Sequence, residues 1–279
     1  MFLCEVSKGS NPFSEAPFIS FLLSRMDVVV RKEVIIMLKI ANLSNFKFIG
    51  LFFLFVGIIS IIGCATPGRS TIRSDRPIGS TFKNEKIVNR PFNEVWDDLV
   101  SNLAKSFFVI NNIEKESRII NVSFYSETPE KFVDCGKTHR YYSRGNENQE
   151  YVYDIAASSS YKSASAAGPN KNLPMTIFAN RRTSLDGRIN IYVAPKGTGT
   201  QVTANARYIL TLNLTGTYVV ENVYGNPIER GNMPPSSATC SFNTNQPNTC
   251  VLGSDQKQTV SITCQSKGIL ETEILNFVK

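Results

Sequence analysis

Gln201-Val-Thr-Ala-Asn-Ala-Arg-Tyr-Ile-Leu-Thr-Leu-Asn-Leu214 carries the clearest structural pattern in the chain. From Val202 to Leu214, every second position holds an apolar residue. Successive side chains of a β-strand point to opposite faces, so this alternation predicts a strand with one buried face. Its length predicts a position in the centre of an antiparallel sheet.

Further strands are predicted on both sides of this segment. Residues 175–182 and 188–194 flank Asp186-Gly187, a dipeptide typical of a two-residue hairpin turn. Residues 196–200 are expected to turn directly into the long strand. The other predicted strands are 107–113, 118–125, 150–155, 218–224 and 258–264.

Two amphipathic helices flank the strands in the sequence. After Pro91, apolar residues recur with the spacing of one helical face, at Phe92, Val95, Trp96, Leu99, Val100, Leu103 and Phe107. Gly268 precedes a second helix, which carries Leu270, Ile274, Phe277 and Val278. Each helix has a single apolar face and must cover a sheet with it. The predicted fold is α+β, an antiparallel sheet with an N-terminal and a C-terminal helix packed on one face.

Composition sets the predicted domain boundaries. Residues 64–81 contain Pro, Gly, Ser and Thr without apolar periodicity, which predicts a flexible stalk. Residues 82–279 are long enough for a single domain. Two loop insertions are expected in it, a Ser/Ala-rich segment near 156–172 without packing periodicity and a surface excursion near 225–250.

The segment before the stalk has the composition of a secretory signal peptide. Residues 48–65 form a run of 18 uncharged residues, preceded by Lys39 and Lys47. This basic start followed by an apolar run is typical of such peptides. The alternative is an uncleaved membrane helix, because a run of this length lies near the lower limit of what spans a bilayer.

The start of translation follows from the length of the signal. Counted from Met37, the signal peptide covers 37–63, which is within the usual length of such peptides. Residues 1–36 are then an upstream extension from a misassigned start codon. Met26 is a second possible start.

The apolar run ends in Ile61-Ile62-Gly63-Cys64. This tetrapeptide resembles the lipobox of bacterial lipoproteins. The resemblance implies that Cys64 carries a diacylglycerol, that cleavage occurs between Gly63 and Cys64, and that palmitate or similar acyl chains hold the mature protein to its membrane. In Gram-negative lipoproteins a residue other than Asp after the cysteine, here Ala65, implies the outer membrane. We expect the protein on its inner leaflet, facing the periplasm.

Four cysteines remain after lipidation of Cys64. An even number in an exported chain indicates disulfides, for which three connectivities are possible. We favour Cys240 with Cys250, which closes a short loop rich in Asn, Thr, Ser and Pro, and Cys135 with Cys264. No two cysteines have the spacing of a zinc or redox site, so neither a metal nor a cofactor is expected.

The net charge of the chain is too small and too evenly spread to indicate a strongly acidic partner such as nucleic acid. From Cys64 onward there are 24 basic and 19 acidic residues, a net charge of +5 without a long block of like charge. An exported chain of this kind is not expected to bind nucleic acid. Its surface is compatible with anionic lipid headgroups or peptidoglycan.

Catalytic motifs are scarce. The sequence contains no Gly-rich phosphate loop, no His-Glu-x-x-His and no nucleophile elbow. Cys135 and His139, the only histidine, could form an activated thiol, although a disulfide at Cys135 would remove the nucleophile. The carboxylate pairs Asp97, Asp98 and Glu271, Glu273 are predicted on polar helix faces. Tyr141, Tyr142, Tyr151 and Tyr153 could pack within strands or form a carbohydrate or partner surface.

The order of elements over 82–279 is similar to the helix-grip arrangement of outer-membrane lipoproteins such as the C component of the barrel-assembly machinery. The sequence therefore predicts a non-enzymatic envelope lipoprotein that contacts envelope proteins during envelope assembly or in a secretion-type complex. One alternative is a periplasmic binding module that holds an apolar or glycan ligand between the 92–107 helix and the sheet. Another is an envelope hydrolase that uses Cys135 and His139.

Overall fold

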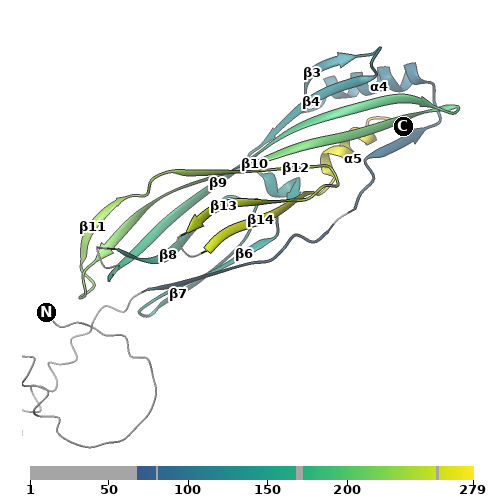
Figure 1. Ribbon diagram of the computed structural model, residues 1–279. Coiled ribbons are helices and arrows are strands. Elements are labelled where there is room, and N and C mark those ends of the chain that lie inside the picture. The colour runs from purple at the N-terminus through teal and green to yellow at the C-terminus, as the bar shows by residue number, and fades with distance from the viewer. Residues whose placement is uncertain (1–67, 80, 168–171, 256–257) are drawn as a thin grey trace, which may run out of the picture. The chain divides into compact units, whose positions relative to one another are not determined.

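A computed structural model describes residues 68–79, 81–167, 172–255 and 258–279 (Figure 1). The predicted extension, the signal peptide, Gly63 and Cys64 lie outside these ranges. The side chains of residues 252–260 are also outside the described part. The described part is largely antiparallel sheet and contains two helices.

Two long strands run the length of the main sheet (Figure 1). β9 (Leu173–Lys196) and β10 (Gly199–Glu221) pair antiparallel in unbroken register, from Met175 opposite Val220 to Lys196 opposite Gly199. The two-residue connection between them contains Gly197 at φ +62°, a backbone conformation that glycine adopts without steric cost. The predicted turn at 196–200 and the central position of the long strand are confirmed.

The other strands of the main sheet pair along the outer edges of this hairpin. β4 (Ile119–Ser126) and β8 (Ser159–Ala167) pair with successive halves of β9, and β3 (Val109–Glu114) pairs with β4. β10 pairs successively with β2 (Glu85–Val88), β12 (Ser236–Asn243) and β11 (Pro227–Asn232). Each of the two long strands therefore has neighbours on both of its edges.

Two smaller sheets complete the strand pairing in the described ranges. In one, β6 (Lys137–Arg144) lies between β1 (Arg69–Ser74) and β7 (Glu147–Asp154). In the other, β14 (Gln258–Ser266) lies between β13 (Asn248–Asp255) and β5 (Val133–Asp134). A short 3₁₀ turn, Pro129–Lys131, precedes β5.

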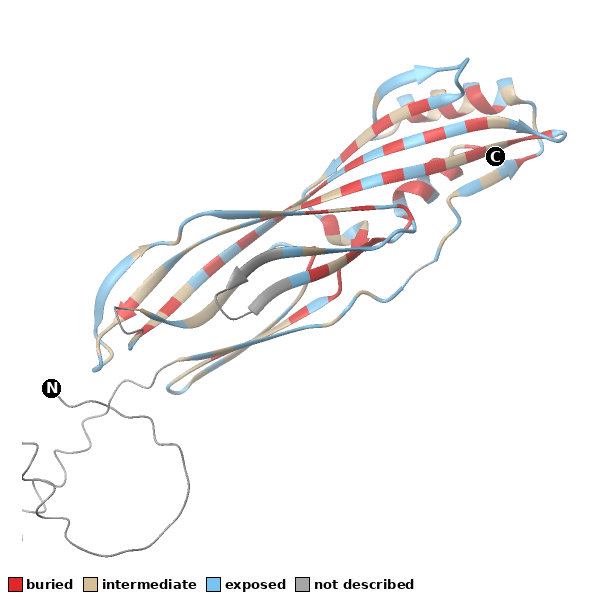
Figure 2. Ribbon diagram, viewed as in Figure 1, coloured by how far each residue is buried: buried red, intermediate tan, exposed pale blue. Residues whose placement is uncertain are grey.

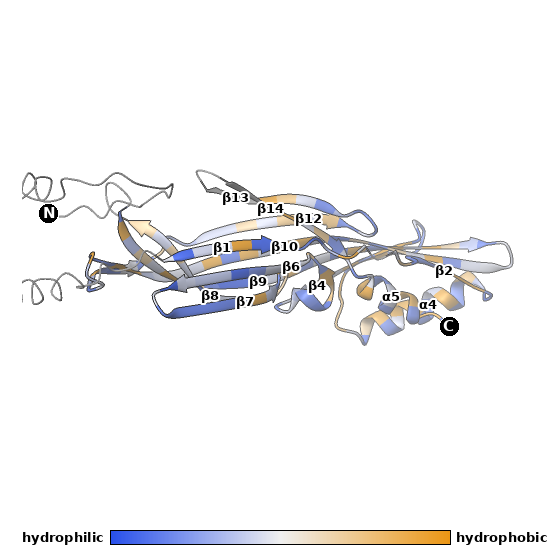
Figure 3. Cartoon of the chain, turned by 90° about the horizontal axis from the view of Figure 1, so that it is seen from below, coloured by the Kyte–Doolittle hydropathy of each residue, from blue (hydrophilic) through white to orange (hydrophobic). Residues whose placement is uncertain are grey.

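One hydrophobic core contains side chains from the long strands and from both helices. Burial alternates residue by residue along the helix-proximal parts of β9 and β10 (Figure 2), and Val202, Tyr208 and Leu210 are fully buried. Helix α4 (Phe92–Ala104) buries Val95, Trp96, Leu99 and Leu103 in this core, and α5 (Ile269–Asn276) buries Leu270 and Ile274. Hydrophobic and hydrophilic residues alternate around both helices (Figure 3). The core position of Trp96 and the apolar faces of both helices are confirmed, with one exception. The first helix ends at Ala104, before Phe107, which is 56% exposed.

The hairpin turn predicted at Asp186-Gly187 is wrong. Both residues lie within β9, with Asp186 opposite Ile209 and Gly187 opposite Tyr208. The apolar alternation keeps the same phase on both sides of the dipeptide, so an uninterrupted strand buries Leu185 and Ile189 on one face. Gly187 belongs to this buried face, near Leu270 and Phe124. Tertiary pairing therefore overrides the local turn signal.

Three segments predicted to lack regular structure contain strands. Residues 69–74, inside the predicted stalk 64–81, form β1 and pair with β6. The predicted insertion at 156–172 contains β8, and the one at 225–250 contains β11, β12 and the start of β13. Residues 218–221, predicted as part of a separate strand, continue β10. β8 and β12 carry mostly Ser, Thr, Asn and Ala, and β1 and β11 are short, so none of them has an apolar alternation that would identify it.

Candidate functional site

A groove of about 1020 Å³ lies where β6, β7 and β8 meet β9, β10 and β11. We call it the ionic groove. Its charged and aromatic lining includes Arg144, Glu147, Lys162, Phe178, Glu221 and Arg230. These residues come from six strands, and sequence reasoning had identified none of them. No local motif links them, since Arg144 and Glu221 are 77 positions apart.

Arg144 and Glu221 form one wall of the ionic groove. The Arg144 guanidinium donates two hydrogen bonds to the two carboxylate oxygens of Glu221, one of them 2.8 Å long, and a further one of 2.8 Å to Thr176 Oγ1. Both side chains of the ion pair are less than a fifth exposed. This bidentate ion pair, together with the hydrogen bond to Thr176, holds the Arg144 guanidinium in a fixed orientation.

Lys162 and Glu147 form a second ion pair in the ionic groove, with 2.5 Å between Nζ and Oε1. The hydrogen bond to Glu147 raises the pKa of Lys162 above its ordinary value, so the ammonium is charged at neutral pH. Its Nζ also lies 5.8 Å from the centre of the Phe178 ring. That distance is within the range of a cation–π contact.

Arg230 gives the ionic groove an excess of positive charge. It is an exposed residue of β11 and makes no ion pair with any residue in the described ranges. Three cations, Arg144, Lys162 and Arg230, therefore face two carboxylates, Glu147 and Glu221. The net charge of the lining is +1.

The first described residues of the chain lie beside the ionic groove. A Cβ on Gly68 would be 3.6 Å from the Cβ of Arg144, and β1 pairs Arg69 with Ser143. The Ser70 hydroxyl accepts a hydrogen bond of 2.7 Å from the amide of Ala164 in β8. Residues 68–70 are thus fixed next to the wall that Arg144 forms.

No known protein family, curated protein or solved structure matches this chain. Among the described residues, neither helix has the length and apolar composition needed to cross a bilayer. The site must therefore be interpreted from its own chemistry.

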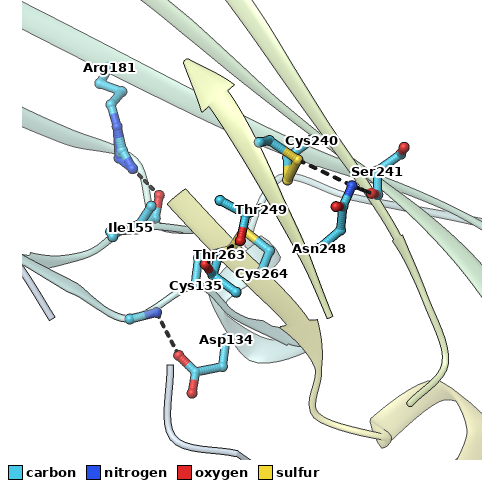
Figure 4. The surroundings of a disulfide bond; sticks show 12 residues. Asp134, Cys135, Ile155, Arg181, Cys240, Ser241, Asn248, Thr249, Thr263 and Cys264 are labelled. Atoms are coloured by element: carbon cyan, nitrogen blue, oxygen red, sulfur yellow. Dashed lines mark hydrogen bonds between the residues drawn. A yellow bond between two sulfur atoms is a disulfide. The ribbon is translucent and has the colours of Figure 1, made fainter. Parts of the chain in front are cut away.

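The predicted cysteine pairing agrees with the structure. Cys135 and Cys264 have sulfur atoms 2.01 Å apart, and those of Cys240 and Cys250 are 2.02 Å apart (Figure 4). The first bond ties the segment between β5 and β6 to β14. The second joins β12 to β13.

The predicted pair of Cys135 and His139 is not a catalytic pair in the structure. Cys135 is bonded to Cys264 and carries no free thiol. His139 Nε2 lies 3.0 Å from Asp75, and its Nδ1 lies 3.7 Å from Glu150. These carboxylates contact opposite sides of the ring, so they do not converge on one ion, and the described residues contain no cluster suited to a metal.

The contacts of Asp75 predict a loss of stability in acid. Hydrogen bonds from Arg73 and from His139 hold the pKa of Asp75 below its ordinary value of 3.8. The folded protein is therefore stabilised while the carboxylate is ionised. This contribution to stability is lost as the pH falls through the lowered pKa of Asp75. We expect Asp75→Asn to reduce the fall in the thermal unfolding midpoint between pH 5 and pH 3, measured by circular dichroism. Asp186→Asn, at an exposed residue without an ion pair among the described residues, is the control, and an equal reduction there would contradict the assignment.

The tyrosine cluster is largely part of the packing. Tyr142 is buried, and Tyr153 stacks on Tyr161 at 5.9 Å between ring centres. The Arg140 guanidinium lies 4.0 Å from the centre of the Tyr161 ring, and Arg181 lies 5.1 Å from that of Tyr153. These contacts join β6 and β7 to β8 and β9. Only Tyr141 of the predicted cluster is substantially exposed.

Glu271 is not on a polar helix face as predicted but is fully buried. Its carboxylate accepts hydrogen bonds from the hydroxyls of Tyr208, at 2.8 Å, and Thr244, at 2.7 Å. Burial, together with the nearby Glu271 carboxylate, raises the pKa of Tyr208, so its hydroxyl stays protonated and donates. Asp97 and Glu273 are exposed, and the half-buried Asp98 pairs with Arg90 at 2.7 Å. Glu271 lies one position after Leu270 in the sequence, and nothing in the local pattern marked it as buried.

A row of asparagines crosses the exposed face of the main sheet. The strand registers place Asn112 opposite Asn121, Asn121 opposite Asn190, and Asn190 opposite Asn205. The neighbouring row along the same strands contains Tyr192, which is 45% exposed and lies opposite Ile119. We call these two rows the asparagine face. Its polar groups and exposed aromatic ring are of the kind found in protein interfaces.

Proposed function

We propose that this chain is a lipid-anchored envelope protein without enzymatic activity, which acts through contacts with other envelope proteins. The observation that carries the proposal is the close succession of a lipobox-like Cys64 and a domain with two disulfides. Disulfides persist mainly in oxidising compartments outside the cytosol. Only residues 65–67 separate Cys64 from the first described residue of that domain. The expected location is the periplasmic side of the outer membrane, and the expected role is in envelope assembly or a secretion-type complex.

A helix-grip arrangement, with both helices on one face of the main sheet, is part of this proposal. It is supported by contacts between the two helical regions. Asn102 of α4 donates a hydrogen bond of 2.8 Å to the carbonyl of Phe277, directly after α5. The rings of Phe108 and Phe277 meet edge to face at 6.4 Å. Both helices also contribute to the core that contains Ile189, Ile191 and Val202.

The anchor is tested by substitution of the lipobox cysteine. In cells fed labelled palmitate, we expect the wild-type protein to carry the label and to sediment with membranes. Cys64→Ala should lose the label and leave the signal peptide uncleaved, because the acceptor sulfur is gone. The readouts are label incorporation and the electrophoretic shift of the uncleaved form.

Ser60→Ala is the control for this experiment. Ser60 lies in the predicted signal peptide but carries no sulfur for acylation, so its substitution should change neither label nor processing. If the wild-type protein incorporates no label, or Cys64→Ala is processed normally, the lipid anchor is wrong.

Partner contacts are tested on the asparagine face. A photo-crosslinking amino acid at position 190 should capture one specific envelope protein in living cells, identified by mass spectrometry. The same amino acid at position 237, on exposed Ser237 of β12, is the control. An identical set of products at both positions would contradict a specific interface at the asparagine face.

A binding module is the second candidate function, and the ionic groove favours it. The sequence placed a ligand between the 92–107 helix and the sheet, but four side chains on the apolar side of α4 are buried in the hydrophobic core. The ionic groove lies elsewhere, and it combines aromatic surface with fixed charged groups, as ligand sites commonly do. The hydrolase alternative has no comparable observation in its favour.

A further inference from the structure

We propose that the ionic groove binds the phosphodiester headgroup of an anionic phospholipid in the membrane that holds the anchor. The inference rests on the proposed lipid anchor at Cys64. It adds a second, non-covalent contact with the bilayer, made by the folded domain itself. Three features of the groove support it, namely its charge, its apolar surface and its position in the chain.

The charge of the ionic groove matches a single negative charge. Two of its three cations are neutralised, Arg144 by Glu221 and Lys162 by Glu147. Arg230 remains without an ion pair among the described residues. A planar guanidinium with free donors suits a phosphate group, to which it can bind through two parallel hydrogen bonds. A phosphodiester carries one negative charge, which equals the +1 excess of the lining.

The surface beneath these charges is apolar enough for the glycerol and acyl part of a lipid. Phe178 is 40% exposed, and Val219 and Pro227 also line the groove. The side chains of Phe178 and Val219 share one face of the main sheet, because Phe178 pairs with Thr217 and Thr176 with Val219. Free phosphate would leave this apolar surface in water, whereas a lipid would cover it.

The chain brings this groove close to the predicted anchor. Gly68 lies against Arg144, and four Cα-to-Cα steps separate it from Cys64. A fully extended chain of that length spans at most about 14 Å. An acylated Cys64 therefore keeps the wall of the ionic groove near the headgroups of its own leaflet, where the local concentration of lipid is high.

The test uses the full-length protein extracted in a neutral detergent. Its probes are three soluble compounds: dihexanoyl phosphatidylglycerol, dihexanoyl phosphatidylcholine and inorganic phosphate. Binding is measured by isothermal titration calorimetry for the wild-type protein, Arg230→Gln and Arg207→Gln. Arg207 is an exposed arginine of β10 outside the ionic groove and serves as the matched control. Arg230 is exposed at a sheet edge, so its substitution should leave the circular dichroism spectrum unchanged.

We expect saturable binding of the phosphatidylglycerol that is weakened about tenfold by Arg230→Gln, since a hydrogen-bonded charge contact is typically worth at least that factor. Arg207→Gln should bind as the wild type does, and phosphatidylcholine and inorganic phosphate should bind more weakly. Equal affinity for inorganic phosphate, equal affinity for phosphatidylcholine, no binding at all, or no effect of Arg230→Gln would each overturn the inference. Retained palmitate labelling in those cases leaves the lipid anchor standing, whereas loss of labelling removes both.

Discussion

Replacing Cys135 and Cys264 together by alanine is expected to lower the free energy of unfolding by about 5 kcal/mol. The bond joins residues 129 positions apart, so it restricts the unfolded chain strongly, and the loop-entropy relation gives about that value. Both sulfur atoms belong to buried residues of the core. Alanine avoids placing a hydroxyl there. Urea denaturation followed by circular dichroism under oxidising conditions measures the difference.

Cys240→Ala with Cys250→Ala is the matched control for this prediction. That bond closes a separation of only 10 residues, for which the same relation gives a loss of about 3 kcal/mol. The long-range pair should therefore lower the urea midpoint more than the short-range pair. An equal or reversed order would contradict the entropic explanation.

Glu271→Ala is expected to lower the free energy of unfolding by about 3 kcal/mol. The substitution leaves the buried hydroxyls of Tyr208 and Thr244 without their carboxylate acceptor, and each such loss costs about 1–3 kcal/mol. It also removes the polar link from α5 to β10 and to the turn after β12. The measurement is again urea denaturation of the oxidised protein.

Two further variants separate the hydrogen bonds of Glu271 from a general effect on α5. Glu273→Ala, at an exposed position of the same helix, should change the free energy of unfolding by less than about 0.5 kcal/mol. Tyr208→Phe combined with Glu271→Ala should cost less than the sum of the two single losses, because both remove the same hydrogen bond. Strict additivity would show that the two side chains are not coupled.

The elements that could be predicted from sequence were those with a strong apolar period. Residues 202–214 alternate, and the helix after Pro91 repeats its apolar positions every three or four residues, so one buried face defines each of them. The hairpin at Asp186-Gly187 failed because a two-residue turn signal is local. The pairing of β9 with β10 on one edge and with β4 on the other is long-range, and the local signal does not contain it. β8 was missed because its side chains are mostly small, and β1 because its six residues show no apolar alternation.

The candidate site could not be predicted from the sequence, for a different reason. The ionic groove is assembled from strands far apart in the chain, and its ion pairs join residues such as Arg144 and Glu221. Neither residue belongs to a recognisable motif, and either would be taken for an ordinary surface charge. The disulfides were easier to predict, because four cysteines allow only three connectivities and one of these closes a short polar loop. An even number of cysteines and a predicted export signal were sufficient to suggest disulfides.

The unbroken ladder between β9 and β10 has a mechanical consequence for an anchored protein. It contains 22 residue pairs, which at the usual rise per residue correspond to a contour of roughly 70 Å. The ionic groove lies toward one end of this ladder, and α4 contacts the residues toward the other. If the groove end rests on the bilayer, the hairpin acts as a stiff spacer. It would hold the helical end several nanometres out into the surrounding compartment, available to proteins that never touch that membrane.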